Sequence, residues 1–286
     1  MPGRRIIGVD VGATKLLAGA VDTDFFVHRR VQRSVSGLEQ SSLLDAIAIG
    51  VHEVAALAGG EIEAIGFSLP GRIDSAAGSI AGRHPALRDA PFAAIMAERL
   101  GLPAIADHAG NLAALAEHRA GAARGADNAI VLTVGDAISA GVIRHGELHR
   151  GVSELAGIEP LASDAALTRE AQRIASARPA SALASAQREL QAALVIELAH
   201  DGDAAAREAL ALIGTRLGAE IARLADTLHP EVVVIAGDVL GAGELLLAPT
   251  RTQLDVPVVA AQFGVEAAMV GAATLARECL TAGNPA

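Results

Sequence analysis

Residues 6–22 read Ile-Ile-Gly-Val-Asp-Val-Gly-Ala-Thr-Lys-Leu-Leu-Ala-Gly-Ala-Val-Asp. Two apolar runs flank the short stretch Gly12-Ala13-Thr14-Lys15, and this pattern predicts two strands, 5–10 and 16–22, joined by a tight turn. A glycine in such a turn lets backbone N–H groups approach an anion, because no Cβ blocks the approach. Asp10, at the end of the first strand, can hold a metal-bound water beside that anion. The stretch therefore predicts a phosphate site, with an ordinary glycine-turn hairpin as the alternative.

The composition is that of a globular chain with an aliphatic core. Of the 286 residues, 51% are hydrophobic and 20% charged, with no Trp or Tyr and only five Phe. This length allows one large domain or two lobes. The scarcity of aromatic side chains and the net charge of −10 argue against a nucleic-acid surface.

The cysteine count and the hydropathy pattern bound the location of the protein. The single cysteine, Cys279, excludes an internal disulfide and a multi-cysteine zinc cluster. Charged residues interrupt the N-terminal apolar stretch, so no signal peptide is expected, and no stretch reaches the uncharged length of a membrane span. We therefore expect a cytoplasmic protein without a membrane partner.

The hydrophobic periodicity predicts alternating strands and helices, and hence an α/β fold. The expected strands are 5–10, 16–22, 25–35, 64–69, 104–106, 129–134, 141–144, 231–236 and 256–260. The expected helices are 39–58, 91–100, 111–123, most of 163–200, 203–228 and 267–280. Asn111 is a good N-cap residue and is expected to open the third helix. A strand–turn–strand unit occurs twice, which predicts a duplicated architecture.

Five stretches carry a family resemblance through their order and spacing. They are 6–22, 68–74, 111–117, 145–151 and 229–237. Together they resemble the ROK family (repressors, open reading frames, kinases) of bacterial sugar kinases and sugar-responsive repressors, in the ASKHA superfamily. The resemblance implies a two-lobed ribonuclease H-like fold of the actin/hexokinase type, with a small-molecule ligand in the interlobe cleft. It also implies a homodimer.

The resemblance implies lobe boundaries and partners. The N-terminal lobe is expected at 1–110, with the C-terminal helix 267–286 returning to it, and the C-terminal lobe at 111–266. Repressors of the family carry a winged helix-turn-helix before the kinase-like part. Here that part begins at residue 5, so no direct nucleic-acid binding is expected.

The resemblance also assigns the nucleotide site, in which we expect weakened binding of ATP and Mg²⁺. The cofactor-binding residues that it implies are Asp10, Gly12, Thr14, Lys15, Thr133, Gly135 and Gly237. Two of the three nucleotide elements depart from the family pattern. Asp136 stands in the second phosphate turn, where a carboxylate facing a triphosphate is unfavourable unless a cation intervenes. Asp238 stands in the adenosine turn, where the family has a small residue.

The family's catalytic tetrad, Asn-Asp-Ala-Asn, becomes His108-Ala109-Gly110-Asn111. The aspartate of that tetrad is the family's general base, and Ala109 at its position has no group that accepts a proton. Asp107 lies two residues earlier, displaced by roughly 6–7 Å if the chain is extended there. His108 has a suitable ordinary pKa. Asp107 and His108 are therefore the candidate catalytic residues.

The family's sugar contacts are altered as well. Its Pro-Asn-Leu becomes Pro85-Ala86-Leu87, and its Gly-Glu-Ile-Gly-His becomes Gly157-Ile158-Glu159-Pro160-Leu161. Asn111 and Glu159 remain as candidate substrate residues. Each lost hydrogen-bond partner costs about 1–3 kcal/mol, so ordinary hexose recognition is not expected. The family's zinc segment is missing, so no structural zinc is expected.

Three functions follow from these observations. The first is a pseudokinase, a ligand-binding or regulatory protein impaired in catalysis. The second is an active ATP-dependent hexose or amino-sugar kinase, a phosphotransferase that uses Asp107 or His108 as a relocated base. The third is an enzyme of altered chemistry, with a polar pocket formed by Asp107, His108, Asp136 and Glu159. The loss of the base and of the sugar contacts in one chain favours the first.

Overall fold

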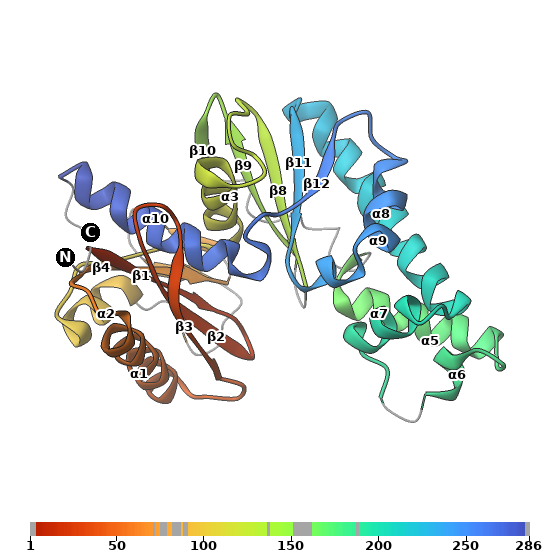
Figure 1. Cartoon of the computed structure of the whole chain (residues 1–286), viewed down its shortest axis with the longest axis horizontal. Helices are drawn as coiled ribbons and strands as arrows, with labels where there is room; N and C mark the ends of the chain where they lie inside the picture. Colours follow the sequence, from red (N-terminus) through yellow and green to blue (C-terminus); the bar gives the residue numbers. More distant parts are fainter. Residues whose placement is uncertain are drawn as a thin grey trace. The chain divides into compact units, whose positions relative to one another are not determined.

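The computed structural model describes residues 4–70, 72–74, 79–81, 87, 91–135, 138–150, 162–186 and 189–283. The chain divides into two compact units (Figure 1), Met1–Ala120 with Glu266–Ala286, and Gly121–Val265. The C-terminal segment thus belongs with the N-terminal unit. The boundary falls after residue 120, so α3 (Ala109–Ala120) is part of the first unit.

The first unit is built on a five-stranded sheet of order β3-β2-β1-β4-β7. Its strands are β1 (Arg5–Val11), β2 (Lys15–Val21), β3 (Val27–Ser34), β4 (Ile62–Leu69) and β7 (Ala104–His108). β1, β4 and β7 run parallel, whereas β1, β2 and β3 form an antiparallel meander. A separate ribbon, β5 (Arg72–Asp74) and β6 (Ser79–Ala81), was not expected from the sequence.

Helices cover both faces of this sheet. On one face, α1 (Gln40–Ala58) and α2 (Phe92–Leu100) close a core with alternate strand residues such as Val9, Phe67 and Leu69. On the other face lies α10 (Ala267–Thr281) (Figure 1), and α3 packs mainly against α10. By length and composition alone, α1 could cross a membrane; its buried residues pack into this core, as in the core helix of a globular domain.

Glycines set how closely α10 packs on the sheet. A Cβ added at Gly8 would lie 2.0 Å from the Met269 carbonyl oxygen, and one at Gly66 would lie 1.8 Å from that of Ala272. A Cβ at Gly271 would lie 1.8 Å from the Leu112 carbonyl oxygen of α3. Only glycine permits these backbone contacts.

The second unit repeats the strand arrangement of the first. Its sheet has the order β10-β9-β8-β11-β12, with β8 (Ala129–Val134), β9 (Ile138–Arg144), β10 (Glu147–His149), β11 (Val232–Ala236) and β12 (Val258–Ala260). β9 pairs antiparallel with both β10 and β8, whereas β11 pairs parallel with both β8 and β12. The repeated order confirms the duplicated α/β architecture expected from the sequence.

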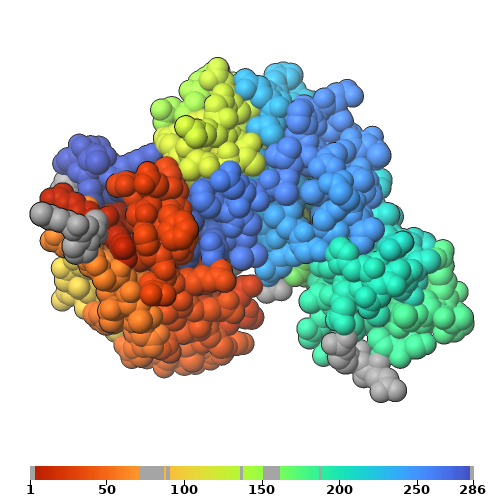
Figure 2. Space-filling view, viewed as in Figure 1, coloured from red at the N-terminus to blue at the C-terminus, as the bar shows by residue number. Residues whose placement is uncertain are grey.

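Helices pack on this second sheet around an aliphatic core that includes Ile130, Ile213 and Leu246. They are α5 (Asp164–Ala177), α6 (Ala182–Ser185), α7 (Ala192–His200), α8 (Ala204–Leu228), η2 (Asp238–Ala242) and α9 (Glu244–Arg251). A further short helix, η3 (Gly264–Glu266), lies at the unit boundary and has no buried residue. The helical stretch expected at 163–200 is therefore three helices. Their residues gather together on the surface (Figure 2).

Candidate functional site

Three polar residues form a row across the parallel strands of the first unit. Asp10 pairs with Ser68, and Ser68 pairs with Asp107, at the carboxyl ends of β1, β4 and β7. Residues paired in register share a face, and neighbouring strands lie about 4.8 Å apart, so Asp10 and Asp107 are separated by about 10 Å. Ligands of open α/β sheets bind at the carboxyl ends of strands, which makes this row the candidate site of the first unit.

Asp10 is held by a neighbouring hydroxyl group. Ser68 is fully buried, and its Oγ donates a hydrogen bond of 2.6 Å to Asp10 Oδ1. Burial raises the pKa of the Asp10 carboxyl, against the opposing effects of the Ser68 hydrogen bond and the Lys15 charge. The ionised carboxylate is therefore under-solvated, a state that a nearby cation relieves.

The turn between β1 and β2 differs in one respect from the expectation. The Gly12 N–H donates to the Lys15 carbonyl oxygen at 2.8 Å, and the Val35 N–H donates to the Thr14 carbonyl oxygen at 2.8 Å. A Cβ at Gly12 would lie 3.0 Å from the Lys15 carbonyl oxygen. Gly12 thus closes the turn instead of offering its N–H to an anion. Ala13, Thr14 and Lys15 are exposed at its tip.

Asp107 and His108 both hold the first turn of α3. β7 runs directly into α3, whose first residue is Ala109. Asp107 Oδ1 accepts from the His108 N–H at 2.7 Å and from Asn111 Nδ2 at 2.9 Å. His108 Nδ1 accepts from the Gly110 N–H at 3.1 Å. Both side chains are almost fully buried, at 3% and 5% exposure. Both candidate bases therefore accept hydrogen bonds that stabilise the first turn of α3.

The expectation that Asn111 opens the helix was wrong. Asn111 lies in the first turn of α3, which begins at Ala109, two residues earlier. The helix can begin there because the Asp107 side chain accepts from the His108 N–H and the His108 side chain accepts from the Gly110 N–H. The amide nitrogen of Asn111 faces the Asp107 acceptor. Its buried Oδ1 has no hydrogen-bond partner among the described residues. An unpaired buried acceptor costs about 1–3 kcal/mol, so Asn111 suits a ligand that brings a donor, such as a hydroxyl group.

The second unit brings its own predicted residues together. Thr133 pairs with Ala236 at the ends of β8 and β11, and Gly135 and Gly237 follow these strands. Gly237 has a φ of 97°, and a Cβ there would lie 2.3 Å from the Val134 carbonyl oxygen. Within the described ranges, Thr133 Oγ1 is the other buried side-chain atom without a partner. A hydroxyl left unpaired beside glycine turns fits a polar ligand such as a nucleotide phosphate.

Other predicted positions are not covered by the structure. Ala86, Asp136, Glu159 and Leu161 lie outside the described residues. Across the ranges that are described, no group of three or more His, Cys, Asp or Glu side chains could hold a metal ion.

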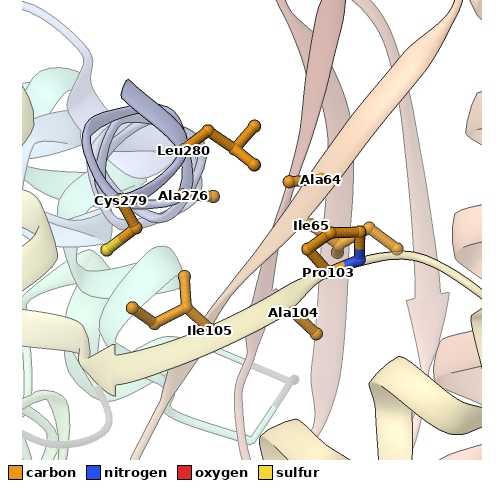
Figure 3. A pocket seen from close by; sticks show the side chains of 8 residues that line it. All are labelled: Ala64, Ile65, Pro103, Ala104, Ile105, Ala276, Cys279 and Leu280. Carbon is orange, nitrogen blue, oxygen red and sulfur yellow. The ribbon is translucent and has the colours of Figure 1, made fainter. Parts of the chain in front are cut away.

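A small pocket lies between α10 and the β4–β7 edge of the first sheet (Figure 3). It is lined by Ala64, Ile65, Pro103, Ala104, Ile105, Ala276, Cys279 and Leu280. Its volume of about 10 Å³ is roughly that needed for one water molecule. Its lining offers neither a charged group nor a side-chain amide, so this pocket is not the site of a sugar or a nucleotide.

The duplicated sheets and the polar strand ends define a class of protein. The chain has the two-unit α/β fold of the actin/hexokinase type, and solved structures bear this out. A ROK-family glucokinase from Streptomyces griseus, solved with glucose and AMPPNP, superposes with a TM-score of 0.87 at 28% identity, over 96% of this chain and 99% of that one. A ROK-family transcriptional regulator has the same fold, with a TM-score of 0.85 at 21% identity, over 99% of this chain and 80% of that one.

Sequence comparison identifies the family within this class. The ROK family model matches residues 6–157 and 155–279, so the chain belongs to the ROK family. A glucokinase of Streptomyces coelicolor is 28% identical over 95% of this chain and 97% of its own length. A glucokinase of Thermotoga maritima is 27% identical over 97% and 99%.

Proposed function

We propose that this chain is a ligand-binding, pseudokinase-like member of the ROK family, impaired in sugar phosphorylation. The observation that carries the proposal is the start of α3. Ala109, with no group to accept a proton, stands where the resemblance places the base. The neighbouring Asp107 and His108 side chains are buried. Asp107 accepts from the His108 N–H and from the Asn111 amide, and His108 accepts from the Gly110 N–H.

In this proposal the protein still binds a nucleotide, although it is impaired in phosphorylating a sugar. Asp10, Thr14 and Lys15 in the first unit would hold magnesium and phosphate, and Thr133 with the two glycine turns would serve the nucleotide in the second. The unpaired Thr133 hydroxyl and the under-solvated Asp10 carboxylate support this. Bound magnesium would supply charge neutralisation to the phosphates. The chain's own residues would orient the nucleotide and exclude water.

A second candidate function is an active hexose or amino-sugar kinase with Asp107 as its base. The strand register favours it, because Asp107 occupies the same row as Asp10, about 10 Å away across two strand spacings. That separation leaves room for a phosphate and a sugar hydroxyl. Asn111, with its unpaired Oδ1 next to Asp107, would then contact the sugar.

Two measurements separate these functions. Thermal stability is first recorded with and without Mg-ATP, and an ADP-release assay then screens hexoses and N-acetylhexosamines. The pseudokinase proposal predicts stabilisation by Mg-ATP with sugar-dependent ADP release about 10²–10⁴-fold below that of an ordinary kinase. Turnover in the ordinary range would establish the kinase instead, and its loss in Asp107→Asn, which keeps one acceptor oxygen for the start of α3, would assign the base to Asp107. Absence of stabilisation at millimolar Mg-ATP would contradict both.

A further inference from the structure

Ser68 lies between Asp10 and Asp107 in the polar row, and its hydroxyl group donates a hydrogen bond to Asp10. We infer that Ser68 is a positioning residue, which fixes one carboxylate oxygen of Asp10 and leaves the other for the magnesium ion of a bound nucleotide. The inference rests on the proposed nucleotide binding. Ser68 is fully buried, and its Oγ lies 2.6 Å from Asp10 Oδ1.

The Ser68 hydroxyl group donates its one hydrogen bond to the Asp10 carboxylate. A serine has only one O–H to donate, and the geometry directs it to Asp10. On the other side of Ser68, Asp107 Oδ1 already accepts from the His108 N–H and from Asn111 Nδ2. Along β4, Ser68 lies between Phe67 and Leu69, whose side chains belong to the opposite, apolar face. The hydroxyl therefore has no role in that core.

The hydrogen bond changes what a cation meets at Asp10. Magnesium demands near-ideal octahedral geometry, so a carboxylate oxygen that binds it must lie in a closely defined position. The Ser68 hydrogen bond to Oδ1 restricts the rotation of the Asp10 carboxylate and thereby fixes the direction of Oδ2. Without the hydroxyl, the carboxylate is free to rotate. Magnesium-dependent binding should weaken, while magnesium-free nucleotide binding should not.

The test is a calorimetric titration of the protein with AMPPNP, with and without Mg²⁺, comparing Ser68→Ala with the wild-type chain. We expect Ser68→Ala to reduce the magnesium-dependent gain in affinity about tenfold, equivalent to about 1.4 kcal/mol. Its magnesium-free affinity should equal that of the wild type. Thr250→Val, which removes a fully buried hydroxyl from the second unit, is the matched control and should leave both affinities unchanged.

The outcomes separate this inference from the proposed function. An unchanged magnesium-dependent gain in Ser68→Ala, with wild-type binding intact, overturns the role of Ser68 alone. A wild-type chain that binds no nucleotide overturns the proposed function and this inference with it. If Ser68→Ala does not fold, Ser68→Cys replaces it. Its thiol is of similar shape but a weak donor, so the magnesium-dependent gain should again fall, and an unchanged gain overturns the inference.

Discussion

At the scale of single residues, stability and ligand binding make opposite demands on Asp10. Burial raises the pKa of its carboxyl above the ordinary value of 3.8. The folded state therefore loses stability as pH rises through the unfolded pKa, and the whole loss is present above the folded pKa. A ligand cation offsets this cost, whereas a neutral side chain avoids it.

Asp10→Asn tests this conflict. Without metal at pH 7, the variant should melt at a higher temperature than the wild type, because no charge is buried. It should also lose the magnesium-dependent part of nucleotide binding. Differential scanning fluorimetry in EDTA, and again with Mg-ATP, measures both effects. If Asp10→Asn melted at a lower temperature than the wild type in EDTA, the ionised Asp10 carboxylate would not destabilise the folded protein.

Asp107 has a structural role that a second substitution isolates. Asp107→Ala removes the acceptor of the His108 N–H and of the Asn111 amide. Leaving these buried donors unpaired should destabilise the protein by about 1–3 kcal/mol. Asp107→Asn keeps one acceptor oxygen and should recover part of that loss. Urea unfolding of both variants measures the difference, and equal stabilities of Asp107→Ala and wild type would rule out this role.

At the scale of elements, the sequence predicted most strands and helices but not how they meet. The strands at 5–10 and 129–134 are apolar runs bounded by turn residues, so local pattern was sufficient. The start of α3 was misplaced because its capping groups come from the Asp107 and His108 side chains of the preceding strand. Gly8 and Gly66 signal a close backbone approach. Their partner, α10, lies at the far end of the chain. The family resemblance placed this helix with the N-terminal lobe, but no local pattern indicated that it packs on Gly8 and Gly66.

Gly66→Ala tests the packing of α10 on the sheet. Its Cβ would lie 1.8 Å from the Ala272 carbonyl oxygen, which is backbone and cannot rotate away. We expect destabilisation of about 1–3 kcal/mol or more. Gly241→Ala is the control, because a Cβ there meets its nearest neighbour, Ile196 Cγ2, at 3.8 Å. Chemical denaturation compares the two, and similar stabilities would refute the close approach.

The turn between β2 and β3 predicts an acid-sensitive contact. Burial opposes the ionisation of Asp22, but hydrogen bonds from His28 and from the N–H groups of Phe26 and Asp24 outweigh it and lower the pKa of Asp22. This stabilisation is present above the unfolded pKa and is lost as pH falls through the folded pKa.

Asp22→Asn should therefore lower the melting temperature at pH 7 and make little difference in strong acid. Melting curves of both proteins from pH 7 down to pH 2 measure this convergence. A gap that stays constant over the whole range would mean that the charge of Asp22 contributes nothing.

At the scale of the whole molecule, the two sheets with one repeated strand order identify the family's fold, and our proposal is that the catalytic residues depart from the family's pattern. The fold was predictable through the resemblance to the ROK family, which five stretches from 6–22 to 229–237 carry by their order and spacing and none carries alone. The row of Asp10, Ser68 and Asp107 was not predictable, because it depends on the register of β1, β4 and β7. The sequence pattern singled out Asp10 and Asp107 separately and gave Ser68 no role.

The most direct test of the central claim is sugar-dependent ADP release by the wild-type chain with saturating Mg-ATP, over hexoses and N-acetylhexosamines. A positioned general base contributes about 10²–10⁴-fold to the rate, and kinases typically turn over at about 1–100 s⁻¹. We predict turnover lower than that range by about this factor, in a protein that Mg-ATP still stabilises. Turnover within the ordinary range for any of these sugars would contradict the account.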